Sequence, residues 1–128
     1  MNFDQKTPPR QFEVGNSIRF NMKDCGNVYL DENEQVTFVT ENGAQYDVAK
    51  KNWGFYATPS LNGRLVEFGL KTMLIKNTLT GRYFIFLLEK GKEWELENYL
   101  KQESLEVVAS LSTTEELDAV AEVLKVRQ

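Results

Sequence analysis

The stretch Tyr83-Phe84-Ile85-Phe86-Leu87-Leu88 decides the fold, because it is the longest strongly apolar run of this 128-residue chain. Its side chains do not alternate between apolar and polar, and a strand of this kind is normally covered on both faces of its sheet. Each such side chain contributes roughly 1.5 to 3 kcal/mol when it is fully buried. We therefore expect residues 82–89 to form a central strand that is a principal source of stability.

The chain before this run is a succession of short strands and turns. Alternating or short apolar segments predict strands at 12–14, 18–22, 28–30, 35–40, 44–48 and 70–76. The clearest turn is Asn42-Gly43, because this pair favours the type I′ hairpin, in which both central residues adopt positive φ. We therefore expect a mostly antiparallel, β-rich N-terminal part over about residues 11–89.

The hydrophobic period changes after the apolar run. Apolar residues at helical spacing predict a helix over about 92–102 and another over about 113–126, with a strand between them at 105–111. Ser112 and Glu115 have the spacing of a capping box at the start of the second helix. Strands that precede helices in the chain predict an α+β fold, in which the two C-terminal helices cover the β-rich part.

Size and composition favour one domain. A chain of 128 residues with 41% hydrophobic and 27% charged residues is typical of a single globular domain. Residues 1–10 are polar and include Pro8-Pro9, so we expect a short polar N-terminal arm before a single domain over 11–128. Cys25 is the one cysteine, which excludes an internal disulfide. Because no apolar leader follows Met1 either, we expect a soluble, cytoplasmic protein.

Several classes of site are excluded by the residues that the chain contains. The absence of histidine removes the most common general base and metal ligand. One cysteine cannot supply the ligands of a zinc site, and the carboxylates of residues 31–34 lack the spacing of a calcium loop, so we assign no metal. Cys25 falls in a predicted turn over 24–27, and Asp24 opposes the activation of its thiol. We assign no catalytic residue.

The expected partners are restricted in the same way. Glycine-rich phosphate-binding patterns are absent, and we expect no cofactor. A net charge of −4 argues against nucleic acid as a partner, because nucleic-acid binding needs an excess of Lys and Arg. The longest apolar run is far shorter than the roughly 20 residues of a transmembrane helix. Neither nucleic acid nor a membrane is therefore an expected partner.

One segment, residues 52–64, combines aromatic, hydroxyl, amide and guanidinium side chains. The candidate ligand-binding residues in it are Trp53, Tyr56, Ser60, Asn62 and Arg64. The rings can stack on a sugar or a base, the hydroxyl and amide groups can bond hydroxyls, and the guanidinium can hold a carboxylate or phosphate. In the alternative interpretation, the aromatic residues fill the core and the polar residues form plain turns.

Two functions remain open at this point. The first is a small non-catalytic binding or accessory module that recognises an unidentified polar small molecule or a partner protein through this segment. The second is a small metal-independent enzyme that acts on a sugar or nucleotide-sugar, because tyrosine and carboxylates can transfer protons. Homodimerisation through an exposed sheet edge or the aromatic segment is compatible with either function. A pocket that joins Tyr56 and Arg64 to a carboxylate favours the enzyme, and a flat apolar patch favours protein binding.

Overall fold

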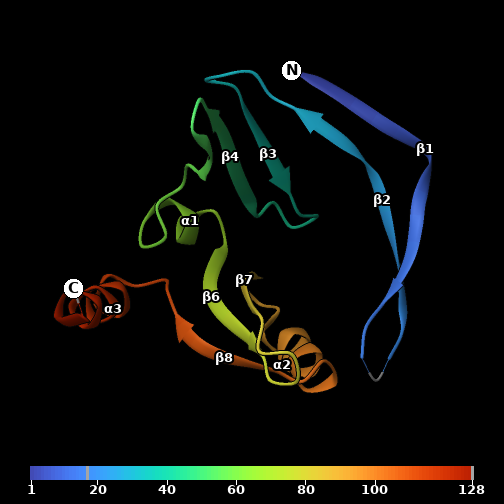
Figure 1. Cartoon of the computed structure of the whole chain (residues 1–128). Helices are drawn as coiled ribbons and strands as arrows, with labels where there is room; N and C mark the ends of the chain where they lie inside the picture. The colour runs from blue at the N-terminus through green and yellow to red at the C-terminus, as the bar shows by residue number, and fades with distance from the viewer. Residues whose placement is uncertain (17, 128) are drawn as a thin grey trace.

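The computed structural model describes residues 1–16 and 18–127, and it has an α+β architecture in which strands predominate (Figure 1). The strands are β1 (Asn2–Val14), β2 (Phe20–Tyr29), β3 (Gln35–Val39), β4 (Gln45–Lys51), β5 (Gly54–Ala57), β6 (Leu70–Asn77), β7 (Tyr83–Glu89) and β8 (Leu105–Ser110). The helices are α1 (Arg64–Glu67), α2 (Glu93–Gln102) and α3 (Thr114–Arg127). The predicted α+β class is confirmed.

The strands form three antiparallel sheets, with the orders β1-β2, β3-β4-β5 and β7-β6-β8. The predicted antiparallel hairpin before β5 is confirmed, since Val39 pairs with Gln45 and the register continues to Gln35 and Ala49. Its turn is not type I′, because Asn42 does not adopt positive φ. Residues 40–44 form a longer loop instead, in which the amide of Thr40 donates to the carbonyl of Ala44 at 2.9 Å.

The prediction of a central strand over residues 82–89 is wrong. This run forms β7, which lies at the edge of its sheet, and β6 is the central strand. Ile75 on β6 is fully buried, whereas Tyr83, Phe84 and Ile85 on β7 are exposed. An apolar run predicts that a strand is covered, but it does not say whether the cover comes from the same chain.

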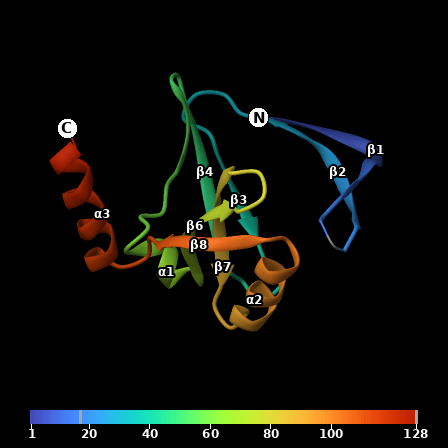
Figure 2. The same ribbon diagram turned by 60° about the horizontal axis from the view of Figure 1, so that its bottom comes forward.

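The two C-terminal helices differ in how they meet the strands. Helix α2 packs on the sheet through Tyr99, whose ring lies 6.2 Å from that of Phe86 on β7. Helix α3 projects to one side of β6 and β8 (Figures 1 and 2). The capping box is one residue later than predicted, because Thr113 and Glu116 exchange the hydrogen bonds, each 3.0 to 3.1 Å long. The Ser112 hydroxyl instead bonds the backbone of Thr72 on β6.

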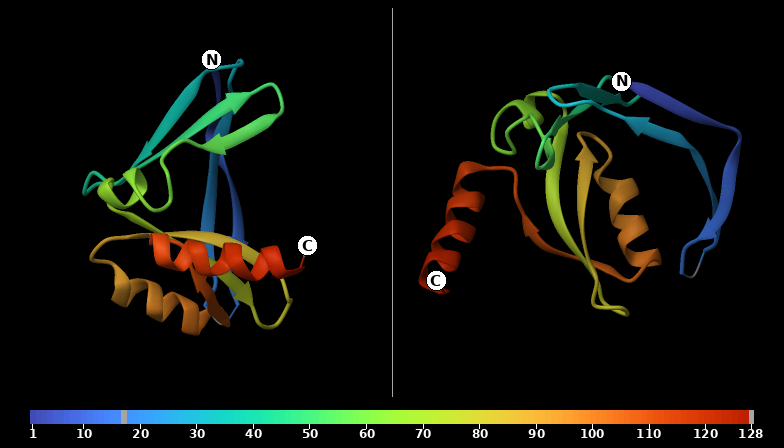
Figure 3. Two further views of the ribbon diagram at one scale, coloured as in Figure 1. Left: turned by 90° about the vertical axis from the view of Figure 1, so that its left-hand side faces the viewer. Right: turned by 45° about the horizontal axis from the view of Figure 1, so that its top comes forward.

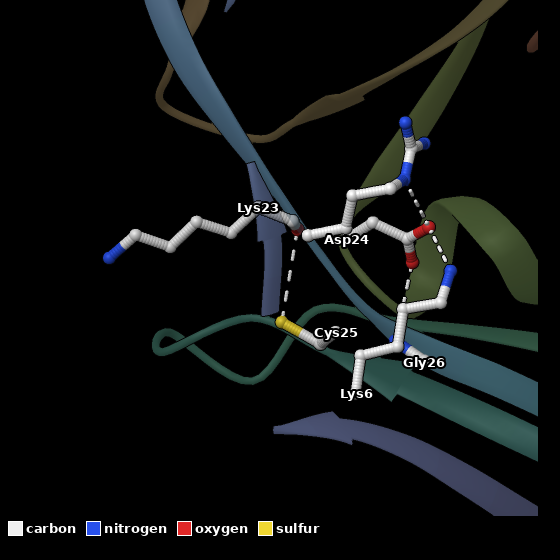
Figure 4. A network of polar contacts seen from close by, with 6 residues as sticks. Lys6, Lys23, Asp24, Cys25 and Gly26 are labelled. Carbon is white, nitrogen blue, oxygen red and sulfur yellow. Dashed lines mark hydrogen bonds and ion pairs between the residues drawn. The ribbon is translucent and has the colours of Figure 1, made fainter. Parts of the chain in front are cut away.

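The first residues, where a polar arm was predicted, belong to β1, and residues 2–5 and 10–14 of this strand pair with β2. The resulting long hairpin arches on the side of the molecule opposite α3, with α2 and the β7-β6-β8 sheet between them (Figures 1 and 3). Asp24 on β2 contacts two residues of β1 at the register shift between Gln5 and Arg10. Its carboxylate accepts a hydrogen bond from Lys6 at 2.5 Å and lies 3.5 Å from the Arg10 guanidinium (Figure 4). The polar composition of residues 1–10 and the Pro8-Pro9 pair had predicted an arm and not a strand.

The molecule is open rather than closely rounded. Its core is small: Leu65, Leu70 and Ala44 form the buried cluster between α1, β6 and β4. The solvent-accessible surface is 9208 Å², whereas a compact chain of 14.8 kDa exposes about 7,000 Å². No helix in the described residues is long and apolar enough to cross a membrane.

Candidate functional site

The aromatic part of the segment 52–64 lies on the surface. A tight connection between β4 and β5 places Trp53 beside Tyr56, with ring centroids 5.8 Å apart and ring planes 29° apart. Their exposed fractions are 68% and 45%, and Phe55 between them is exposed as well. The alternative interpretation, in which these rings fill the core, therefore does not hold for Trp53, Phe55 and Tyr56.

Three polar candidates of the segment, Ser60, Asn62 and Arg64, each have a structural partner. The Ser60 hydroxyl accepts from the amide of Arg64 at 3.2 Å, at the start of α1. The Asn62 amide group donates to the hydroxyl of Thr114 at 3.1 Å, which ties the segment to α3. The structure thus brings Trp53 to Tyr56 and Ser60 to Arg64, and it directs Asn62 toward a different element. A role of these residues in ligand binding stays a prediction.

Arg64 lies beside a buried carboxylate. Its guanidinium nitrogen is 3.9 Å from Asp47, whose side chain is buried on β4, and its charge lies 5.2 Å over the ring of Phe68. The Asp47 carboxylate also accepts from the Thr37 hydroxyl at 2.5 Å. The Asp47 carboxylate therefore contacts both the Arg64 guanidinium at the start of α1 and the Thr37 hydroxyl on β3.

The region around Cys25 is an exposed part of β2 rather than the expected turn (Figure 4). The sulfur lies 3.8 Å from the carbonyl oxygen of Lys23, and the neighbouring Asp24 engages Lys6. Hydrogen bonding from Lys6 holds the pKa of Asp24 below its usual value. In the turn at 31–34, the backbone amide of Asp31 donates a hydrogen bond to the carboxylate of Glu34 at 2.7 Å. No group of three potential metal ligands occurs in the described residues.

A pocket of about 480 Å³ lies between the tip of the β1-β2 hairpin, the β6-β7 turn and α2. Its polar centre is Glu103, which ends α2 and is only 8% exposed. Both carboxylate oxygens of Glu103 lie 3.0 Å from the amide nitrogen of Asn16. Desolvation, and then the Glu103 charge, raise the pKa of the Tyr99 hydroxyl in the same pocket. The remaining lining residues are Gly15, Asn77, Leu79, Thr80, Phe84, Phe86 and Leu105.

This pocket could not be found from the sequence. Glu103 and Asn16 are 87 positions apart, and each reads locally as an ordinary polar residue at the end of an element. The one available signal was the position of Glu103, because a carboxylate at the C-terminal end of a helix is electrostatically unfavourable. That position implies a compensating partner, but it does not identify one.

A second hollow, of about 640 Å³, follows the free edge of β7. It is lined by residues 85–89 of β7 and by Lys92, Glu95 and Leu96 at the start of α2. The groove therefore has one wall formed by an unpaired strand and one formed by a helix, with charged side chains on the helix side. Such a groove offers backbone hydrogen-bonding groups together with apolar side chains.

Comparison of the chain with protein-family models, with curated proteins and with solved structures finds no match, so its function has to be inferred from these surfaces alone.

Proposed function

We propose that the chain is a non-catalytic binding module that accepts an extended segment of a partner protein by strand addition to β7. In this mode the partner's backbone pairs with the free sheet edge, and alternate side chains enter the neighbouring groove. The observation that carries the proposal is that β7 pairs only with β6 among the described strands, beside the groove that it forms with α2.

The two edges of the β7-β6-β8 sheet differ in their protection. The pairing of β8 with β6 is interrupted by an irregularity opposite the Leu74-Ile75 step, and both edge strands carry one glutamate, Glu106 on β8 and Glu89 at the end of β7. The pairing of β7 with β6 continues without interruption from Tyr83 to Glu89. Natural proteins protect free edges with bulges, charges or proline, because a regular apolar edge recruits other strands. The regularity of β7 favours an edge that is used for binding.

The exposed side chains of β7 indicate that its cover comes from another chain. Ile85 is 56% exposed although it belongs to the most apolar run of the sequence. The whole molecule exposes about 2,200 Å² more than a compact chain of its mass, and a typical partner buries about 800 Å² of each surface. The excess area is therefore large enough for a stable interface.

The groove also suits an extended segment by its shape and its charges. Leu96 and the β7 side chains form an apolar floor, and Lys92 and Glu95 place one positive and one negative charge at the rim. Apolar centres with polar rims are typical of protein interfaces. The enzyme alternative has less support, because Asp47, the carboxylate beside Arg64, is already paired.

A fluorescently labelled peptide with alternating valine and threonine tests the proposal directly. We expect saturable binding by anisotropy and slower amide exchange in β7. The same peptide with N-methyl groups on alternate residues keeps its side chains but loses the ladder hydrogen bonds, so it should not bind. Ile85→Lys should weaken binding at least about tenfold, because it places a charge on the contact face.

The matched control is Val107→Lys on β8, the opposite edge of the same sheet, where the side chain is also exposed. It should leave peptide binding within about twofold, which is well below 1 kcal/mol. Size-exclusion chromatography with light scattering tests whether the bound segment comes from a second copy of the chain. If the chain is a dimer and Ile85→Lys is a monomer, the bound segment is β7 of the second copy. Equal effects of the two lysine variants, or binding of the N-methylated peptide, contradict strand addition.

A further inference from the structure

We propose that the pocket at the C-terminal end of α2 binds an organic cation, with an ammonium group placed at Glu103 and an apolar body between the aromatic rings. Phe86 of β7 lines both this pocket and the groove beside the strand edge, but a cation held by side chains does not depend on strand addition. It lies where the hairpin tip, the β6-β7 turn and α2 meet.

The negative charge at the centre of the pocket lacks a positive partner. Glu103 is buried, and it forms no ion pair within residues 1–16 and 18–127. Its position at the end of α2 places the carboxylate against the negative end of the helix dipole. Among residues 1–16 and 18–127, one amide donor, from Asn16, lies 3.0 Å from the two oxygens. A bound cation would compensate this buried charge, which is costly when it is unpaired.

The hydrogen-bonding capacity of Glu103 leaves room for a ligand. A carboxylate accepts about four hydrogen bonds, and the amide of Asn16 uses only part of this capacity. The side-chain amide of Asn16 is directed elsewhere, because it donates to the hydroxyl of Ser104 at 3.3 Å. An ammonium group has several N–H donors and no acceptor, so it complements the remaining lone pairs.

The walls of the pocket add a second feature that favours a cation. Phe84 and Phe86 are two positions apart on β7 and therefore share a face, and Tyr99 packs against Phe86 with ring centroids 6.2 Å apart. Phe20 from the hairpin lies 6.3 Å from the same tyrosine ring. The negative faces of aromatic rings attract cations, and pockets of this kind recognise alkylated ammonium groups.

The lining residues also select against other ligands. None of the described residues that line the pocket is Lys or Arg, so nothing there would neutralise a phosphate or carboxylate. One carboxylate without other charged ligands does not form a metal site. The volume of about 480 Å³ fits a small organic molecule, since pockets for such ligands span roughly 300 to 1,000 Å³. The charge and the rings together point to an amine with an aromatic or aliphatic body.

A charge series of one molecular shape tests this inference. We would titrate the full chain at neutral pH with benzylamine, benzyltrimethylammonium, benzyl alcohol and benzoate, by calorimetry and by amide chemical shifts. The two cations should bind with a Kd of about 1 mM or lower, the alcohol more weakly, and benzoate not measurably. The shifts should centre on Asn16, Tyr99 and Glu103. Benzoate binding as well as benzylamine, or no saturable cation binding, overturns the proposal.

Three variants distinguish the effect of the Glu103 charge on cation binding from an effect on folding. Glu103→Gln keeps an acceptor for the Asn16 amide and should weaken benzylamine at least about tenfold, without changing benzyl alcohol. Glu97→Gln, an exposed residue of α2 that pairs with Lys101 at 3.4 Å, removes the same charge and should leave both affinities unchanged. Phe84→Leu keeps the wall apolar and should weaken the cations about two- to fivefold. This last variant decides the question if Glu103→Gln fails to fold, and equal effects of Glu97→Gln and Glu103→Gln contradict a specific site.

Discussion

Replacing Thr72 with valine is expected to raise the free energy of unfolding, which is the opposite of the usual effect of a core substitution. Thr72 lies on the central strand β6 and is 2% exposed. Its hydroxyl is buried and has no hydrogen-bond partner among the described residues. An unsatisfied buried hydroxyl costs about 1 to 3 kcal/mol, and valine has nearly the same shape without that group. We therefore expect a gain of about 1 to 2 kcal/mol.

The assay is equilibrium urea unfolding together with thermal unfolding of the purified chain. For a chain of this size, each kcal/mol corresponds to about 3 to 5 °C in Tm. The urea midpoint should rise while the slope of the transition stays the same, because the buried area does not change. A decrease of more than about 0.5 kcal/mol in the free energy of unfolding, in a variant with unchanged secondary structure, would refute the reasoning. Substitutions without a structural effect usually change this free energy by less than about 0.5 kcal/mol.

Ser112→Ala is the control with the opposite sign. The Ser112 hydroxyl accepts from the amide of Thr72 at 2.8 Å and donates to its carbonyl at 3.2 Å, and both residues are buried. The alanine variant leaves the buried amide of Thr72 without its partner, whereas the Thr72 carbonyl still accepts from the amide of Leu111 at 2.9 Å. The unpaired amide should cost about 1 to 3 kcal/mol. Opposite signs at two residues in contact would show that the polar groups, and not the volume, determine the stability of this junction.

The remaining predictions concern the core, the cap of α3 and the hairpin. Ile75→Ala should cost about 2 to 5 kcal/mol in urea unfolding because Ile75 is fully buried, whereas Ile85→Ala on the exposed edge should cost less than about 1 kcal/mol. A hydrogen bond from the amide of Ser112 lowers the pKa of Glu116, so the cap contributes its full stabilisation above the ordinary pKa near 4.5 and loses it as pH falls through the lowered pKa. An NMR titration should give a pKa of Glu116 below the ordinary value, and Glu116→Gln should remove this part of the pH dependence of stability. Asp24→Asn removes the negative charge that pairs with Lys6 and Arg10 at the register shift of β1 and should accelerate amide exchange in the hairpin alone, whereas equal acceleration in β6 would contradict a local role.

The composition of the segment 52–64 indicated a candidate ligand site, but it left open whether the aromatic rings lie on the surface or fill the core. Trp53 and Tyr56 stack on the surface, and their role in ligand binding stays a prediction. The prediction could not say that Asn62 is tied to α3, or that Arg64 faces a buried Asp47 on β4. Those contacts join residues that are far apart in the chain, so no local pattern records them.

The sequence by itself determined the class of fold. Alternation with period two, glycine and asparagine at turns and helical spacing after residue 91 are local properties, and they produced the antiparallel strands and the two longer helices. The absence of histidine, also visible at once, limited the chemistry.

Only the tertiary structure decided which apolar residues are covered and which polar residues meet. The run from Tyr83 to Leu88 became an edge because β8 returns to the other side of β6, which no property of the run itself could specify. Glu103 became the centre of a pocket because the hairpin tip brings Asn16 to it across 87 positions. Strand order and burial depend on contacts between distant segments, whereas secondary structure depends mainly on neighbours along the chain.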